Sequence, residues 1–169
     1  MFGLNLIARA VIVHEGKFLV TVLDDGKRAP FHNLLGGHMK VGEPMIDSVV
    51  REVREEVGLD VAPVKLLYLM ENYWARQGSK LHEIGYYFLC HPLRPIEGDL
   101  LSQLTPDTEE MISPELLTPE ELLAANFQPE PLKQFLAADL AAKWASCPRL
   151  IVHNELPGHS EARNASYEL

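Results

Sequence analysis

Four glutamates lie close together in residues 36–60 and could hold a divalent cation. They are Glu43, Glu52, Glu55 and Glu56. Carboxylate oxygens are hard ligands that favour Mg²⁺ or Mn²⁺ over zinc. A cation of this kind activates water and neutralises phosphate charge, so these residue types point to metal-assisted chemistry on a phosphate compound.

Three of these acids fall at unfavourable positions on a predicted helix. We expect the helix over 44–57, because Pro44 suits a first turn and Gly58 suits a left-handed cap. Glu52 and Glu56 repel each other at i,i+4 by about 0.2–0.5 kcal/mol. Glu55 and Glu56 end the helix, where its dipole disfavours anions by about 0.3–1 kcal/mol. A cation held between the carboxylates would reverse each penalty.

The alternative to a metal site is a helix whose charged side chains simply face solvent. Its core face is predicted to consist of Ile46, Val49, Val50, Val53 and Val57. Arg51 and Arg54 are predicted on the side away from Glu52 and Glu56, although Arg51 is also spaced for an i,i+4 pair with Glu55.

The segments around this helix indicate interleaved strands and helices. Strands are predicted at 4–13, 18–23, 31–37, 64–74 and 81–91, with a short strand within 109–117. Helices are predicted at 118–125, capped by Thr118, and at 129–144. This order predicts an α/β or α+β sandwich, in which helices cover a mixed sheet. We expect one domain over 1–145 and a C-terminal extension, 146–169, that runs over the surface without forming a separate domain.

Composition narrows the class of protein. The chain has 169 residues and a net charge of −9, which argues against a nucleic-acid partner. Cys90 and Cys147 are far apart in sequence, and two unpaired thiols suit a cytoplasmic location. No apolar run is long enough to span a membrane, and no leader-like segment opens the sequence.

The glutamate segment resembles the Nudix box at all of its defining positions. It reads Gly37, five residues, Glu43, seven residues, Arg51-Glu52-Val53, one residue, Glu55-Glu56, one residue, Gly58-Leu59. The resemblance extends over roughly residues 4 to 145 and implies an α/β/α sandwich around a mixed sheet. It also implies hydrolysis of a nucleoside diphosphate linked to another group, with Mg²⁺ or Mn²⁺ as cofactor. A Nudix-fold domain that senses such a ligand without cleaving it is the alternative.

The resemblance also implies a role for each residue of the box. Glu52 and Glu56 match the main metal ligands, Glu55 matches a third or water-linked one, and the carbonyl of Gly36 matches another. Arg51 matches a residue that orients a box glutamate, and Glu43 matches a structural acid. Gly37 and Gly42 would let the loop turn tightly, and Gly58 would cap the helix. Leu35 and Lys40 depart from common choices, and Lys40 removes a negative charge from the loop.

Outside the box, Glu83 is the first candidate for a general base. It interrupts an apolar run and is predicted to share a strand face with Leu81, Gly85 and Tyr87, where Gly85 would leave room for substrate. The alternative is an edge-strand charge that opposes aggregation. Glu71 is a second candidate base.

Substrate contacts are predicted at Arg9, His38 and Tyr73. Arg9 could reach a phosphate or pair with a neighbouring acid, and His38 precedes the helix. Aromatic residues of the two later strands could stack a base or fill the core. They are Tyr73, Trp74, Tyr86, Tyr87 and Phe88. A small nucleotide-type partner is expected, a homodimer is possible, and the substrate itself stays open.

Overall fold

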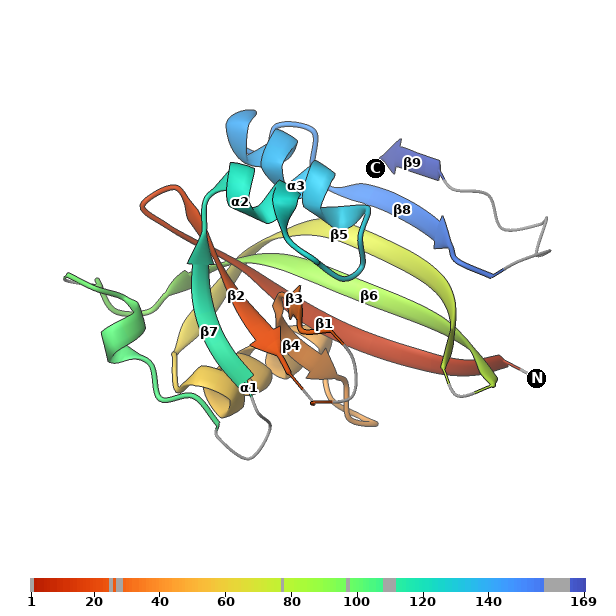
Figure 1. Ribbon diagram of the computed structural model, residues 1–169, viewed down its shortest axis with the longest axis horizontal. Coiled ribbons are helices and arrows are strands. Elements are labelled where there is room, and N and C mark those ends of the chain that lie inside the picture. The colour runs from red at the N-terminus through yellow and green to blue at the C-terminus, as the bar shows by residue number, and fades with distance from the viewer. Residues whose placement is uncertain are drawn as a thin grey trace.

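A mixed sheet with helices on both faces forms the molecule, as the computed structural model shows (Figure 1). The residues described are 2–24, 26, 29–76, 78–96, 98–107, 112–156 and 165–169. The strands are β1 Phe2–His14, β2 Lys17–Leu23, β3 Phe31–Asn33, β4 Leu35–His38, β5 Val61–Arg76, β6 Ser79–Pro92, β7 Ile112–Leu117, β8 Arg149–Asn154 and β9 Ala165–Glu168. The helices are α1 Met45–Val57, α2 Pro119–Ala124, α3 Leu132–Ala141 and the short 3-10 helix η1 Leu101–Gln103.

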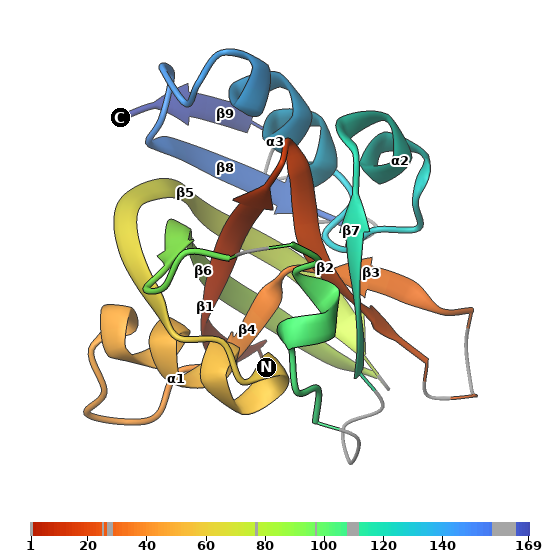
Figure 2. The ribbon, with the colours of Figure 1, turned by 90° about the vertical axis from the view of Figure 1, so that its left-hand side faces the viewer.

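The main path of the sheet runs β3-β2-β1-β6-β5-β8-β9, with β4 paired to β1 and β7 paired to β2. The pairs β1–β6 and β5–β8 are parallel, and the remaining pairs are antiparallel. Helix α1 covers one face, and α2 and α3 cover the other (Figure 2). The predicted mixed sheet between helices is therefore confirmed.

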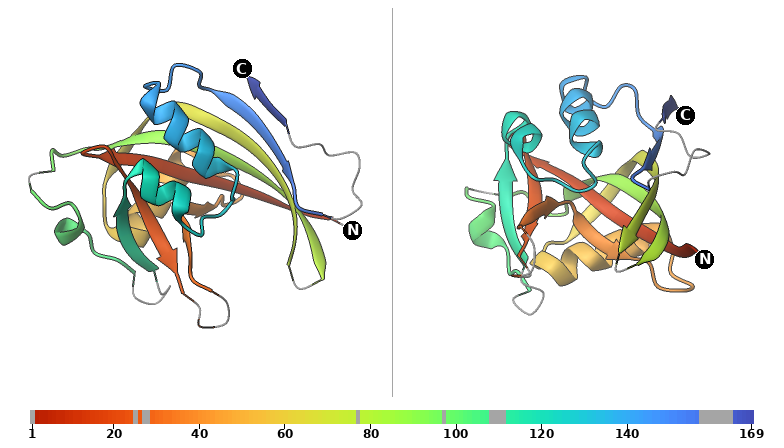
Figure 3. Two further views of the ribbon diagram at one scale, coloured as in Figure 1. Left: turned by 45° about the horizontal axis from the view of Figure 1, so that its top comes forward. Right: turned by 45° about the vertical axis from the view of Figure 1, so that its right-hand side comes forward.

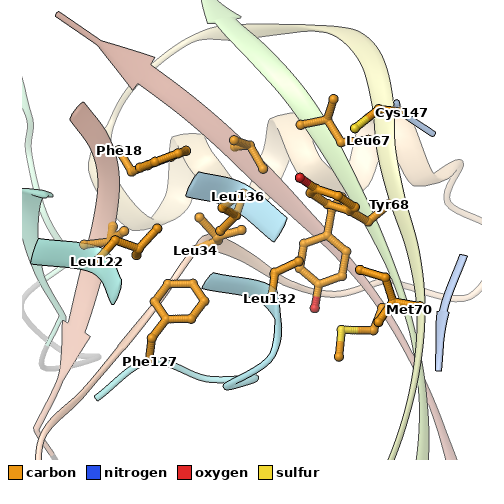
Figure 4. Packing of buried hydrophobic residues seen from close by; sticks show 14 of the residues in the cluster. Phe18, Leu34, Leu67, Tyr68, Met70, Leu122, Phe127, Leu132, Leu136 and Cys147 are labelled. Atoms are coloured by element: carbon orange, nitrogen blue, oxygen red, sulfur yellow. The ribbon is translucent and has the colours of Figure 1, made fainter. Parts of the chain in front are cut away.

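Each face of the sheet has its own core. On the α1 face, Val49, Val53 and Val57 pack with buried residues of β1 and β6. On the α2–α3 face, Leu122, Leu136 and Tyr68 belong to one cluster of buried side chains (Figure 4). These two layers fix the strands in which the functional candidates lie.

Helix α1 differs from its prediction at its first turn. Ile46 is exposed, whereas the buried stripe consists of Ser48, Val49, Val53, Glu56 and Val57. The first turn thus lies beyond the part of the helix that contacts the sheet.

The predicted strand 31–37 is two strands. Residue Leu34 separates β3, which pairs with β2, from β4, which pairs with β1. Leu34 is buried in the core under α2 and α3, whereas Leu35 is buried in the core under α1. Because the chain changes its partner strand at this point, Gly36 and Gly37 of β4 lie beside β1.

The later helices form nearly as predicted. Thr118 caps α2, because its hydroxyl accepts from the Glu121 N–H at 3.2 Å while the Glu121 carboxylate accepts from the Thr118 N–H. Helix α3 is shorter than the predicted 129–144, since Lys143 and Trp144 take left-handed backbone conformations just after it. Cys90 and Cys147 are free and buried.

The expectation that residues beyond 145 run irregularly over the surface is wrong. Strand β8 pairs in parallel with β5 from Tyr68 to Tyr73, and β9 pairs with β8 (Figure 3). Without β8, this side of β5 would be an open edge with unpaired backbone groups. Asp139 of α3 anchors β8 by accepting from Arg149 Nη2 at 3.0 Å. Among the described residues, no helix is long and apolar enough to cross a membrane.

Candidate active site

Glu56 is held by the turn that leads into α1. Its Oε2 accepts from the Gly36 N–H at 2.8 Å, and the residue is only 7% exposed. A buried carboxylate is costly unless it is paired. The tertiary fold therefore fixes the position of the acid that the sequence places beside the apolar stripe.

Glu52 lies against the second glycine of the pair. A Cβ at Gly37 would come within 2.5 Å of Glu52 Oε2. At Gly36, φ is 125° and a Cβ would come within 2.2 Å of the Ala8 carbonyl oxygen. Successive glycines in β4 thus bring the strand close to β1 on one side and to two carboxylates of α1 on the other.

Arg51 connects the remaining acids. Its Nε donates to Glu43 Oε1 at 2.7 Å, and its Nη1 donates to Glu52 Oε1 at 2.6 Å and to Glu55 Oε2 at 2.8 Å. The prediction that Arg51 points away from Glu52 is wrong, because its long side chain reaches across the helix surface. The i,i+4 pair with Glu55 is confirmed. Arg54, by contrast, pairs with Asp60.

The same guanidinium fixes Glu43 at the start of the helix. Its hydrogen bond is the main cause that lowers the pKa of Glu43 to about 2, and the Lys40 N–H contributes next. In return, Glu43 raises the pKa of Arg51. Lys40 Nζ lies 3.8 Å from Glu55 Oε1, so the cation that departs from the usual box pattern faces a box carboxylate.

The end of α1 is closed as predicted. Gly58 has φ of 68°, and its N–H donates to the Arg54 carbonyl at 2.9 Å. The Thr105 N–H donates to the Val57 carbonyl at 2.9 Å, which satisfies a carbonyl left over at the helix end. Gly42 has φ of 83°, which a glycine adopts without strain.

The donor set fits a hard divalent cation. The Glu52 and Glu56 carboxylates meet the backbone of Gly36 and Gly37, where a side chain would leave them no room. Oxygen ligands of this kind suit Mg²⁺ or Mn²⁺. Among the described residues, no group of three or more acidic, histidine or cysteine side chains is already gathered as a metal site. Arg51 Nη1 bridges Glu52 and Glu55, whereas the Gly36 N–H holds Glu56.

A cavity of about 620 Å³ opens beside the box. It lies on the sheet face that α2 and α3 cover, and its lining combines polar and apolar side chains. Three of the predicted residues, Arg9, His38 and Glu83, line it. These residues come from β1, β4 and β6, so only the folded sheet brings them together.

Arg9 links this cavity to the box. Its Nη1 donates to the Leu34 carbonyl at 2.9 Å and also to the Gly36 carbonyl. His38 makes a second link, since its carbonyl accepts from Arg51 Nη2 at 3.2 Å. The positive end of the cavity is thus the end nearest the metal-ligand candidates.

Glu83 lies in the middle of the sheet rather than at its edge. Strand β6 is flanked by β1 and β5, so the alternative of an edge-strand charge is wrong. Burial is the main cause that raises the pKa of Glu83, while the charges of Arg9 and His38 oppose the rise. The expected room at Gly85 is absent, because a Cβ there would meet Tyr87 at 2.8 Å and Ile7 at 3.2 Å.

Tyr73 and Glu71 lie away from the cavity, on the other face of β5. Tyr73 Oη donates to Glu71 Oε2 at 3.0 Å, and its ring stacks on His82 with centroids 4.3 Å apart. Among the other aromatics, Trp74 and Tyr87 line the cavity, whereas Phe88 is buried under α1.

Six further polar residues of the lining were missed by the sequence reasoning. They are Asn5, Asn33, Asn72, Asn126, Gln128 and Glu155. Asn72 alternates with Glu71 and Tyr73 along the strand, and this alternation was the available signal. No sequence signal marked Glu155, because it reaches the cavity only through the pairing of β8 with β5.

Comparison with known proteins agrees with this geometry. A NUDIX domain model matches residues 4–138. Among curated proteins, no sequence matches the chain.

Several solved structures share the fold. The mutator protein MutT of Bacillus halodurans is similar with a TM-score of 0.65 and 15% identity, over 96% of each chain. The MutT protein of Methanosarcina mazei Go1 has a TM-score of 0.60 and 20% identity, over 84% of this chain and 96% of that one. A NUDIX hydrolase of Nitrosomonas europaea has a TM-score of 0.57 and 22% identity, over 83% of this chain and 90% of that one.

The family match covers most of the chain, including the strands that line the cavity and the whole of α1. It also includes every predicted site residue, from Arg9 to Glu83. The chain therefore belongs to the Nudix hydrolase family.

Proposed function

We propose that the protein hydrolyses the pyrophosphate bond of a nucleoside diphosphate linked to another group, with Mg²⁺ or Mn²⁺ held by Glu52, Glu56 and the Gly36 carbonyl. The observation that carries the proposal is the continuity of the box with the cavity. Arg9 donates to Gly36 and also lines the cavity, so a substrate in the cavity has its phosphates next to the candidate ligands.

The charges along the cavity give a bound substrate one favoured direction. Arg9 and His38 provide positive or donor groups at the box end, whereas Glu155 adds a carboxylate to the lining. A polyphosphate is attracted by the guanidinium and repelled by the carboxylate. We therefore place the phosphates at Arg9 and the uncharged part of the substrate towards β5.

The residues divide the chemical work. A bound Mg²⁺ or Mn²⁺ ion would neutralise the pyrophosphate and lower the pKa of a water. Glu83 is partly buried and is not among the carboxylates held by Arg51, and its partial burial raises its pKa, which makes it a stronger base. We assign to Glu83 the acceptance of the proton from the attacking water. Arg51 keeps Glu52 oriented, and Gly36 holds Glu56.

A ligand-sensing domain without activity is the second candidate. Arg51 engages Glu52 and Glu55 in the structure, and such pairing could serve stability alone. The presence of Glu52, Glu55 and Glu56 in the box, together with Glu83 in the adjoining cavity, favours the enzyme, because binding alone does not require a general base.

A substrate panel tests the proposal. Nucleoside diphosphate sugars, dinucleotides and nucleoside triphosphates would be incubated with Mg²⁺ or Mn²⁺, and the products identified by mass spectrometry. We expect cleavage of at least one compound by the wild type and its near loss in Glu56→Gln with the fold intact. No cleavage of any compound, with binding retained, would establish the sensor instead.

Metal binding can be checked without any turnover. A ligand that binds only the native state stabilises it by about 2.7 kcal/mol at 100 times its dissociation constant. We therefore expect millimolar Mg²⁺ or Mn²⁺ to raise the melting temperature of the wild type and to have a much smaller effect on Glu56→Gln. Equal shifts in the two proteins would contradict the ligand assignment.

A further inference from the structure

Two buried polar atoms in the cavity lining have no hydrogen-bond partner. They are Asn72 Oδ1 and Trp74 Nε1, both on β5. Asn72 is only 8% exposed. Buried polar atoms are nearly always paired, and an unpaired one lowers the stability of the folded protein. An acceptor and a donor left without partners inside one cavity point to a ligand that supplies both.

The sheet register places these atoms at the end of the cavity away from Arg9. Asn72 lies opposite Glu83 of β6, and Glu83 lies opposite Asn5 of β1. Arg9 is four residues further along β1, which corresponds to roughly 13 Å along the strand. The backbone of Asn72 and Trp74 thus lies a sugar's length or more from that of Arg9, and the carboxylate of Glu83, which the charge of Arg9 affects, lies between the two ends.

Glu155 closes the same end. Its N–H donates to the Tyr73 carbonyl at 2.9 Å, directly between Asn72 and Trp74 in sequence. Its Oε1 lies 3.1 Å from His153 Nε2, which holds the carboxylate beside β5. This segment lies beyond residue 138, where the match to the family model ends.

The chemistry of this end favours a neutral, flat and polar group. Asn72 Oδ1 accepts, Trp74 Nε1 donates, and the indole ring offers apolar surface. The nearby carboxylate of Glu155 disfavours an anion, whereas the carboxylate of Glu83 is within range of the charges of Arg9 and His38 at the phosphate end. A nucleobase edge, which carries a donor beside an acceptor, meets all of these conditions.

We propose that Asn72 and Trp74 select the substrate by hydrogen-bonding the edge of its nucleobase, at an end of the cavity that Glu155 closes. This inference rests on the proposed function for the position of the phosphates. It adds two specificity-determining residues that lie outside the box.

Binding of non-hydrolysable probes tests the selection. The α,β-methylene analogues of ADP, GDP, CDP and UDP would be titrated with Mg²⁺ by calorimetry into wild type, Asn72→Leu and Trp74→Phe. Inorganic tripolyphosphate serves as the probe without a base. We expect the wild type to prefer one base by about tenfold, since two net hydrogen bonds that contribute about 1.4 kcal/mol together would provide this ratio. Each variant should lose most of this preference and keep its affinity for tripolyphosphate.

Stability separates recognition from a structural role. Because leucine removes an unpaired buried acceptor at similar volume, Asn72→Leu should melt at the same temperature as the ligand-free wild type or higher. Trp144→Phe is the matched control for Trp74→Phe, since Trp144 is buried in the core outside the cavity lining. It should leave the base preference unchanged.

The outcomes distinguish this inference from the proposed function. Base-selective binding that the two variants abolish, without cleavage of any natural compound, would support base recognition by Asn72 and Trp74 and refute the hydrolase. Cleavage with no base preference, or a variant that lowers the affinity for every probe equally, would refute base recognition by Asn72 and Trp74 without refuting the hydrolase. A lower melting temperature for ligand-free Asn72→Leu would also count against it.

Discussion

The two faces of the β5–β6 hairpin carry similar polar residues but differ in what these residues contact. On the face away from the cavity, Glu71, Tyr73 and His82 contact one another through a hydrogen bond and a ring stack, and His82 Nε2, which makes no hydrogen bond within the described part of the chain, lies 3.6 Å from Glu71 Oε2. On the cavity face, Asn72 Oδ1 and Trp74 Nε1 have no partner. The same two strands thus present one face on which the polar side chains contact one another and one face on which the unpaired atoms line a cavity.

This difference separates structural polar residues from functional ones. Side chains that satisfy one another need no ligand, so their removal affects mainly local packing. Unpaired buried polar atoms that line a cavity, and a carboxylate in the same cavity whose pKa is raised by burial, are candidates for binding or catalysis. Sequence reasoning gave Glu71 and Glu83 as competing bases, and of the two only Glu83 lines the cavity.

The largest effect on activity is expected from substitution of Glu83, the candidate base on the cavity face. Glu83→Gln removes the basic group while keeping size and most hydrogen bonding. We expect kcat to fall by about 10²–10⁴-fold, the range for losing a general base, with little change in metal affinity. Steady-state kinetics on the best panel substrate would measure this. Unchanged turnover would remove the catalytic distinction between the faces.

Arg9 should give the next largest effect. Arg9→Met removes the guanidinium that lines the phosphate end and donates to Leu34 and Gly36. A charge-assisted hydrogen bond contributes about 1.5–3 kcal/mol, so KM should rise by roughly 10- to 100-fold. Arg54→Met is the control, because Arg54 pairs with Asp60 at an exposed site. Equal KM values in the two variants would contradict a phosphate contact.

A pH effect on stability tests the burial of Glu83 without any substrate. Burial raises the pKa of Glu83 above its value in the unfolded chain. The folded state therefore binds this proton more tightly, and the stability that protonation contributes is lost as pH rises through the folded pKa. As pH rises from acid to neutral, the free energy of unfolding of Glu83→Gln should therefore increase relative to that of the wild type. Urea denaturation in metal-free buffer would measure the gain, and a constant difference across pH would contradict it.

The smallest effect is expected on the face away from the cavity. Glu71→Gln keeps an acceptor for Tyr73 Oη, and Glu71 is absent from the cavity lining. We expect kcat and KM to stay within about threefold of wild type, since surface changes of this kind usually have little effect. A loss comparable to that of Glu83→Gln would show that both faces take part in catalysis.

Much of the box could be predicted from sequence because its geometry is local. Helical periodicity places Glu52 and Glu56 one turn apart, and Gly58 ends the helix in the left-handed conformation that glycine favours. The unfavourable positions of these acids were visible as well, since neighbour and dipole effects depend only on spacing. The direction of Arg51 was not, because a long side chain can reach either way around a helix.

The sequence by itself determined the family, the order of most elements and the acids of α1. Only the tertiary structure decided that Arg9, His38 and Glu83 share one cavity, that Glu71 and Tyr73 lie outside it, and that β8 brings Glu155 to it. The physical reason is that alternation along a strand defines two faces without saying which one is enclosed. Enclosure depends on strands and helices that are distant in sequence, and their pairing leaves no local signal.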